Sequence, residues 1–300
     1  MAAASVRGPV GSGLQKSGGL PHTALVSERI AFVLSGGGSL GAIQLGMLRA
    51  LYERGIVPDL IVGTSAGALN GTFIAARPRE VATIDALLKL WLTLERSDLF
   101  PIGPRAMLGL TGRSSSFVEP AGLRQLIEDN AIIERVEDAP TELHMIATEL
   151  LTGEEYRISS GDIVSGIMAS AAIPGVFPPV ERDGRVLVDG GVSNNTPISQ
   201  AVELGATQIY VLPTGTACPL SKTPRSALAV LMHSFSLLVM QRLWSEIEHY
   251  EDDADLVVMP VPCEADVLPI DFRKTMQLHD DAYTDAKTFL QRRTPTADIR

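Results

Sequence analysis

The segment Gly63-Thr64-Ser65-Ala66-Gly67 places a serine between two glycines in a G-x-S-x-G pattern. It follows an apolar run at 59–62 and precedes a helical pattern at 66–76, which is the context of a nucleophile elbow. The small residues permit a strained turn that lifts the serine hydroxyl out of the sheet edge, and the helix start behind it favours negative charge. A plain turn with Ser65 as helix cap is the alternative. The context favours Ser65 as a nucleophile.

A second glycine-rich segment, Ser35-Gly36-Gly37-Gly38-Ser39-Leu40-Gly41, also lies between a predicted strand and a predicted helix. Backbone N–H groups in such a loop can converge on an anion. One use is an oxyanion hole for a tetrahedral acyl intermediate. The other is a dinucleotide site, because Gly36, Gly38 and Gly41 satisfy G-x-G-x-x-G. The next strand ends in a serine elbow and not in an acidic residue for a ribose, which favours the oxyanion hole.

A serine nucleophile needs a base, and Asp189-Gly190-Gly191 follows a predicted strand at 186–188. An aspartate at the end of a strand is predicted to lie at the same sheet edge as the serine elbow. Burial there would raise its pKa and make it a stronger base. Asp-Gly-Gly by itself usually indicates only a turn. The interpretation of Asp189 as a base therefore depends on its occurrence together with the other two motifs.

A Ser-Asp-His triad is the alternative to a serine–aspartate pair, because His233, His249 and His279 follow Asp189 in the α/β-hydrolase order. His233 lies in an apolar helix, where a packed position is expected. His249 and His279 lie beside acidic residues on helix faces that we predict to be solvated. None of the three follows a strand in a loop, so the sequence favours the pair.

Taken in order, the glycine-rich loop, the serine elbow and the Asp-Gly-Gly segment resemble the patatin-like phospholipase family. Residues 169–179 (Ala-Ser-Ala-Ala-Ile-Pro-Gly-Val-Phe-Pro-Pro) are similar to a block that the family carries shortly before its aspartate. The resemblance spans about residues 30–195. It implies the family's fold and an acyl-enzyme mechanism without a metal or organic cofactor.

The resemblance also implies a role for individual residues. Ser65 would be the nucleophile and Asp189 the base of a catalytic dyad. The oxyanion donors would come from Gly36, Gly37 and Gly38. Many family members carry Arg or Lys in this loop where the present chain has Ser39-Leu40, so a positive charge near the anion is missing here.

The elements that must position these motifs predict an α/β fold with a mostly parallel sheet flanked by helices. Strands and helices alternate along the chain, as in units that build a parallel sheet. The predicted strands are 30–34, 59–62, 143–149, 155–159, 186–188, 208–212 and 256–259. The predicted helices are 40–54, 66–76, 80–95, 162–172, 225–250 and 275–290. Residues 97–120 are predicted to form a surface excursion that could act as a lid.

Composition bounds the class of protein. Of 300 residues, 35 are acidic and 25 basic, for a net charge of −10, which argues against nucleic acid as a partner. The two cysteines, Cys218 and Cys263, are too few for a disulfide framework or a four-ligand zinc site. No apolar run reaches the length of a membrane span, and no secretory signal is predicted.

We therefore predict a flexible tail at 1–28, one hydrolase domain at 29–292 and a C-terminal tail at 293–300. The expected function is hydrolysis of lipid acyl esters of the phospholipase A or lysophospholipase type. The lipid ester is the expected partner, in a cytoplasmic protein with peripheral membrane association left open. A dinucleotide-binding oxidoreductase and a catalytically silent lipid-binding relative are the competing classes. The apolar stretch 227–243 is expected either to line an acyl channel or to pack in the core.

Overall fold

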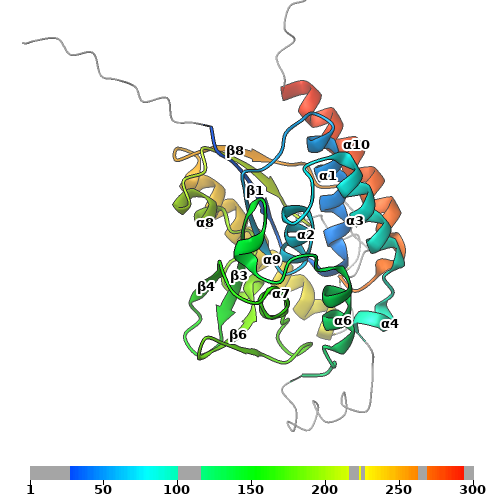
Figure 1. Ribbon diagram of the computed structural model, residues 1–300, viewed down its shortest axis with the longest axis vertical. Coiled ribbons are helices and arrows are strands. Elements are labelled where there is room, and N and C mark those ends of the chain that lie inside the picture. The colour runs from blue at the N-terminus through cyan, green and yellow to red at the C-terminus, as the bar shows by residue number, and fades with distance from the viewer. Residues whose placement is uncertain (1–27, 101–115, 216–222, 224–226, 263–268, 294–300) are drawn as a thin grey trace, which may run out of the picture.

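The computed structural model describes residues 28–100, 116–215, 223, 227–262 and 269–293, which build one eight-stranded sheet with helices on both faces (Figure 1). The predicted α/β class with a mostly parallel sheet is confirmed. The strands are β1 Ile30–Leu34, β2 Leu60–Thr64, β3 Glu142–Glu149, β4 Glu155–Ile158, β5 Val180–Arg182, β6 Arg185–Asp189, β7 Gln208–Leu212 and β8 Asp255–Val258.

The centre of the sheet is parallel and one side is antiparallel. The pairs β3–β2, β2–β1, β1–β7 and β7–β8 are parallel. The pairs β3–β4, β3–β6 and β5–β6 are antiparallel. Since the parallel strands all end at the same edge, β1 and β2 deliver the glycine-rich loop and the serine elbow side by side.

Alternate side chains of the central strands separate into two cores, as a pleated strand requires. Phe32, Leu34 and Ile61 belong to the larger core, under the helices that include α1 and α2. Ala31, Val33 and Val62 belong to the smaller core, which α8 and α9 cover. The sheet is therefore the middle of three layers, and both of its faces are buried.

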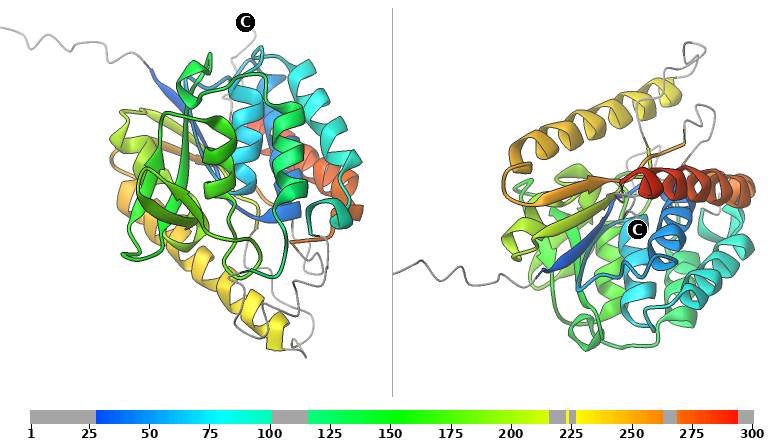
Figure 2. Two further views of the ribbon diagram at one scale, coloured as in Figure 1. Left: turned by 60° about the horizontal axis from the view of Figure 1, so that its bottom comes forward. Right: turned by 90° about the horizontal axis from the view of Figure 1, so that it is seen from above.

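The helices of the described chain are α1 Ala42–Tyr52, α2 Ala66–Ala75, α3 Val81–Thr93, α4 Arg96–Leu99, α6 Ala121–Asn130, α7 Ile163–Ser170, α8 Ile198–Glu203, α9 Ala227–Tyr250 and α10 Thr275–Arg293. Figure 2 shows α9, in yellow and gold, on the side of the sheet opposite the blue and cyan helices α1 to α3. Of the described helices, none has both the length and the apolar character that crossing a membrane requires.

Strand β3 has an extended edge that two other strands share. β2 pairs with residues 142–146 of β3, and β6 pairs with residues 147–149. Because β4 occupies the other edge of β3 along both stretches, β2 and β6 must lie on the same edge. They run toward each other, and their last residues face neighbouring positions of β3, since Thr64 pairs with Ile146 and Asp189 with Ala147.

Most predicted elements occur within a few residues of their expected bounds, but four short ones were not predicted. These are α4, α6, α8 and β5. Helix α4 shows that the start of the predicted 97–120 excursion is regular structure, and α6 begins directly after the excursion. Residues 101–115 of that excursion, both predicted tails apart from their inner ends, and both cysteines lie outside the described residues.

Candidate active site

Ser65 occupies a strained turn between β2 and α2. Its backbone has φ 53° and ψ −119°, a conformation that a residue with a side chain rarely adopts. The Ser65 N–H donates to Ser170 Oγ at 3.0 Å, and the Ser170 hydroxyl donates to the Ile146 carbonyl at 2.6 Å. Ser170 therefore fastens the turn to β3, and the Ser65 side chain is only 5% exposed.

The two glycines of the G-x-S-x-G segment let the chain turn this sharply against its neighbours. A Cβ at Gly67 would lie 2.1 Å from the Leu34 carbonyl oxygen, and one at Gly63 would lie 2.5 Å from the Gly67 carbonyl oxygen. Any larger residue would push α2 away from β1 and β2. The pattern thus has a steric reason at each of its fixed positions, as the elbow interpretation requires.

Asp189 ends β6 next to the end of β2, in the arrangement that the shared edge of β3 creates. Its carboxyl is buried, with Oδ1 accepting the Gly191 N–H at 2.7 Å. The Ser65 hydroxyl approaches closely enough to lower the pKa of this carboxyl. Oδ2 is buried nevertheless, and it accepts no hydrogen bond from any described residue. The two side chains are therefore adjacent but not aligned, as is common before a substrate binds.

Burial sets the protonation behaviour of Asp189. It raises the pKa of the carboxyl from 3.8 to about 6, while the nearby Ser65 hydroxyl and the hydrogen bond from the Gly191 N–H oppose the rise. The charged form is disfavoured because little water or positive charge is near it. A carboxyl with a pKa in this range is a stronger base than a solvated one and is still ionised at neutral pH.

The glycine-rich loop lies directly against the serine, since a Cβ at Gly36 would be 3.1 Å from Ser65 Cβ. The Gly36 N–H, however, already donates to the Asn195 carbonyl at 3.2 Å. This corrects the expectation that Gly36 supplies an oxyanion donor. The N–H groups of Gly37 and Gly38 have no partner among the described residues, and neither does that of Ala66 at the start of α2.

Two residues that hold the site together were not identified from the sequence. Asn195 joins the glycine-rich loop to the Asp-Gly-Gly loop, because its Nδ2 donates to the Gly36 carbonyl at 3.3 Å. Its Oδ1 would lie 2.9 Å from a Cβ at Gly191. Ser170, which fastens the elbow, lies in the 169–179 block that carried the family resemblance. That block was the available signal, but nothing in it distinguished Ser170 from its neighbours.

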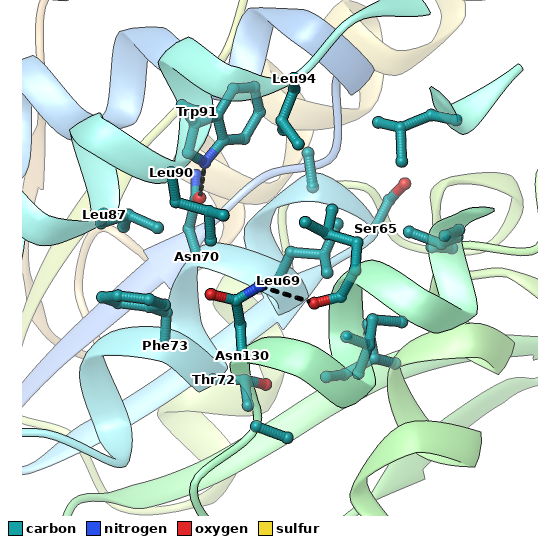
Figure 3. A pocket seen from close by; sticks show the side chains of 18 of the residues that line it. Ser65, Leu69, Asn70, Thr72, Phe73, Leu87, Leu90, Trp91, Leu94 and Asn130 are labelled. Carbon is teal, nitrogen blue, oxygen red and sulfur yellow. Dashed lines mark hydrogen bonds between the residues drawn. The ribbon is translucent and has the colours of Figure 1, made fainter. Parts of the chain in front are cut away.

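An apolar cavity opens beside Ser65 and extends between α2, α3 and α6 (Figure 3). It encloses about 940 Å³ of empty space, solvent at its opening included. Ser65 lies at one side and Phe73 and Leu87 lie across from it. None of the α9 residues whose side chains are described lines the cavity, so these residues do not form the cavity wall.

The three histidines considered for a triad do not join the site. No described hydrogen bond or ion pair links any of them to Ser65 or Asp189. His249 is exposed, as predicted, and His233 is partly exposed. His279 was expected on a solvated face, but it is 3% exposed and its Nδ1 contacts Asp280 at 2.8 Å. It is buried because α10 packs against α1 there.

No metal site is evident near these residues. Within the described ranges, His, Cys, Asp and Glu side chains form no group of three that could hold an ion. The loop that also matches G-x-G-x-x-G has its Gly36 against the serine and its Gly38 against Pro269, whose carbonyl oxygen would lie 2.2 Å from a Cβ at Gly38. This close packing does not favour a pyrophosphate over the loop.

Comparison with known proteins identifies one family. The model of the patatin-like phospholipase family matches residues 32–202. A patatin-like phospholipase domain-containing protein of Caenorhabditis elegans, ZK370.4, is 34% identical over 61% of this chain and 13% of its own length. Patatin-like phospholipase domain-containing protein 7 of Rattus norvegicus is 32% identical over 64% of this chain and 14% of its own length.

The chain thus spans only about an eighth to a seventh of the length of these two relatives. A shorter relative, an uncharacterized NTE family protein of Mycobacterium bovis, is 32% identical over 60% of this chain and 47% of its own length. Among solved structures, VipD of Legionella pneumophila is 16% identical with a TM-score of 0.47, over 88% of this chain and 67% of that one.

Proposed function

The chain belongs to the patatin-like phospholipase family, and from that premise we propose that it is a serine hydrolase that cleaves carboxylic esters of lipids. One observation carries the proposal. A strained, buried Ser65 lies beside a buried Asp189 whose pKa is raised to about 6, and Ser65 lines an apolar cavity. Each feature serves a different requirement of ester hydrolysis: a nucleophile, a base, and a place for an acyl chain.

In the first half of the reaction, the Ser65 oxygen attacks the ester carbonyl carbon while Asp189 takes the hydroxyl proton. The carbonyl oxygen becomes an oxyanion, which the N–H groups of Gly37, Gly38 and Ala66 stabilise. The tetrahedral intermediate then expels the alcohol, which receives the proton from Asp189. An acyl-enzyme on Ser65 remains.

In the second half, Asp189 takes a proton from a water molecule, and the water oxygen attacks the acyl carbonyl carbon. The same N–H groups stabilise the second oxyanion. Its collapse releases the fatty acid and returns the proton to the Ser65 oxygen. The cycle needs only one proton acceptor, because Asp189 acts as base and then as acid in each half.

A carboxylate can serve here without a histidine for two physical reasons. Burial raises the pKa of Asp189 to about 6. The difference between its pKa and that of the serine hydroxyl is therefore smaller, and the proton transfer costs less. The unpartnered N–H groups at the start of α2 and in the glycine-rich loop lower the cost of charge on the substrate oxygen. Both effects depend on a site with little water, and the apolar cavity supplies one.

The apolar cavity is the proposed site of the acyl chain. Its wall is made of aliphatic and aromatic side chains from α2, α3 and α6, so a methylene chain loses water on entering it. The polar head of the lipid would stay near Ser65, outside the cavity. The substrate class proposed is therefore a phospholipid or lysophospholipid ester, with the fatty acid as the released acid.

The test combines covalent labelling and turnover. The purified chain is treated with a fluorophosphonate probe and assayed on p-nitrophenyl esters, a lysophospholipid and a diacyl phospholipid. We expect labelling and ester hydrolysis that Ser65→Ala abolishes and that a matched change of an exposed serine, Ser159→Ala, leaves intact. A folded chain that hydrolyses none of these esters would refute the proposal in favour of a silent lipid-binding protein.

A further inference from the structure

The apolar cavity follows the length of helix α2. Ser65, Leu69, Phe73 and Ala76 line it in succession, and Arg77 lies in its wall just beyond the end of the helix. A helix rises about 1.5 Å per residue, so Ser65 and Phe73 are about 12 Å apart along its axis, and the Arg77 guanidinium reaches back to the Phe73 ring and carbonyl. The cavity therefore has a reacting end at Ser65 and a far end at Arg77.

The Arg77 side chain connects two helices at this far end. Its Nη1 donates to the Phe73 carbonyl at 3.1 Å and its Nη2 donates to the Asn130 carbonyl at 2.9 Å. Asn130 is the last residue of α6. Its own Nδ2 donates to the Leu126 carbonyl at 2.9 Å (Figure 3). The guanidinium thus bridges the carboxyl ends of α2 and α6, which both line the cavity.

The guanidinium is held by geometry and not by a counter-charge. Its central carbon lies 3.7 Å from the centre of the Phe73 ring, a stacking contact that a planar guanidinium makes well. Burial lowers the pKa of Arg77, and no neighbouring carboxylate of the described chain offsets it. A residue fixed between a ring and two carbonyls is a rigid obstacle for anything that extends along the cavity.

We propose that Arg77 closes the far end of the cavity and sets the longest acyl chain that the enzyme accommodates. The inference rests on the proposed ester hydrolysis at Ser65. An extended alkyl chain built from bonds of about 1.5 Å advances about 1.25 Å per carbon, so the roughly 12 Å of cavity between Ser65 and the guanidinium takes about 10 carbons. A longer chain has to fold back or displace the guanidinium from both carbonyls, and its reaction slows.

The test measures kcat/KM of the full chain on p-nitrophenyl esters from 8 to 18 carbons. We expect the parent to prefer chains of up to about 10 carbons. Arg77→Ala removes the bridge and should raise the ratio of kcat/KM for the 18-carbon ester over the 8-carbon ester by about tenfold or more. The matched control is Arg79→Ala, because Arg79 contacts Thr141 and Asp59 outside the cavity wall and should leave the ratio unchanged.

A second variant makes the opposite change. Ala76→Met places a flexible side chain inside the far end and should move the preferred length to shorter chains. If Arg77→Ala does not fold, Arg77→Met, which keeps a side chain of similar reach but cannot donate to the two carbonyls, is measured in its place. An unchanged chain-length profile in the folded variants, with the parent active, would overturn the role of Arg77 only. A parent inactive on every chain length would instead refute the proposed hydrolysis.

Discussion

Two clusters that contain a serine lie at different levels of strand β3. Near its carboxyl end, Ser65 and Asp189 meet beside Ile146. At its amino end, Ser159 Oγ contacts His144 Nδ1 at 2.8 Å, and His144 Nε2 contacts Glu142 Oε1 at 3.0 Å. Judged by hydrogen bonds alone, the second cluster resembles a catalytic triad more closely than the first resembles a dyad.

The surroundings of the two clusters are opposite. Ser65 is buried with a positive φ, next to unpartnered N–H groups and the apolar cavity. Ser159 is exposed and has no such strain, and neither it nor His144 lines the cavity. Glu142 also forms an ion pair with Arg29, and its pKa is lowered even though burial alone would raise it.

The difference shows what a chain of hydrogen-bonded side chains lacks by itself. A nucleophile also needs donors aimed at the charge that develops and a water-poor place for the reacting ester. Only the Ser65 end of β3 provides both. We therefore expect ester hydrolysis at the Ser65 cluster and a structural role for the Ser159 cluster.

The largest effect is expected from the two carboxylates. Asp189→Asn removes the base while keeping the size of the side chain, so kcat should fall by about 10³-fold or more. Glu142→Gln makes the same chemical change at the other cluster and should leave kcat within about twofold. Ester turnover of the two purified variants measures both. Equal losses in the two variants would contradict the assignment of the base.

The same Asp189→Asn variant tests the cost of burying the carboxyl. The folded pKa is about 6 against 3.8 for an ordinary aspartate, so the folded protein binds the proton more tightly. The free energy of unfolding should therefore fall as pH rises from about 4 to 6, by up to about 3 kcal/mol. The variant lacks this titration, so its free energy of unfolding should rise relative to that of the parent as pH increases over this range. Urea unfolding of both proteins at pH 4.5 and 7.5 measures the difference.

The next effect concerns the oxyanion donors. A Cβ at Gly37 would lie 2.2 Å from Thr214 Oγ1, so Gly37→Ala must shift the loop and its N–H groups. We expect kcat to fall by about 10²-fold, with slower fluorophosphonate labelling of Ser65. Thr214 Cβ would lie only 2.6 Å from the new Cβ as well, so adding Thr214→Gly removes the clash and should restore part of the rate. A folded single variant with full activity would show that this loop does not serve the oxyanion.

The pH dependence of the rate is a smaller effect. Asp189 must be ionised to act as a base, and its pKa is about 6. The value of kcat/KM should therefore be level above about pH 7 and fall about tenfold per pH unit well below 6. A solvated aspartate would keep the rate level down to about pH 4. A profile measured on a neutral ester between pH 4.5 and 8.5 distinguishes the two.

The smallest effects are expected from the histidines. His144→Ala breaks the Ser159 cluster, and His233, His249 and His279 can be replaced in turn. Each folded variant should keep ester hydrolysis within about tenfold of the parent, because none contacts Ser65 or Asp189 in the described structure. Loss of a triad histidine would cost several orders of magnitude. A collapse of that size in one folded variant would replace the dyad with a triad.

The elbow and the order of the motifs could be predicted from the amino-acid sequence. Gly63, Ser65 and Gly67 are read from the chain because their reasons are local: a strand, a sharp turn and a helix that starts at once. The sheet class followed from alternating strands and helices for the same reason. These features depend on backbone sterics and on the spacing of apolar residues. Both are determined by residues that are close together in the sequence.

The route by which Asp189 reaches Ser65 could not be predicted from the sequence, because it depends on how distant strands pair. The prediction rested on a shared sheet edge, whereas β6 runs antiparallel and meets β2 end to end along β3. Strand direction depends on which chain segments pair, and no local pattern around 185–189 specifies it. The same holds for Gly36, whose N–H is taken by Asn195 from a distant loop. It holds as well for Arg77, which contacts Asn130 only because α2 and α6 pack together. Contacts between segments far apart in sequence are set by packing, and packing is decided by the whole fold.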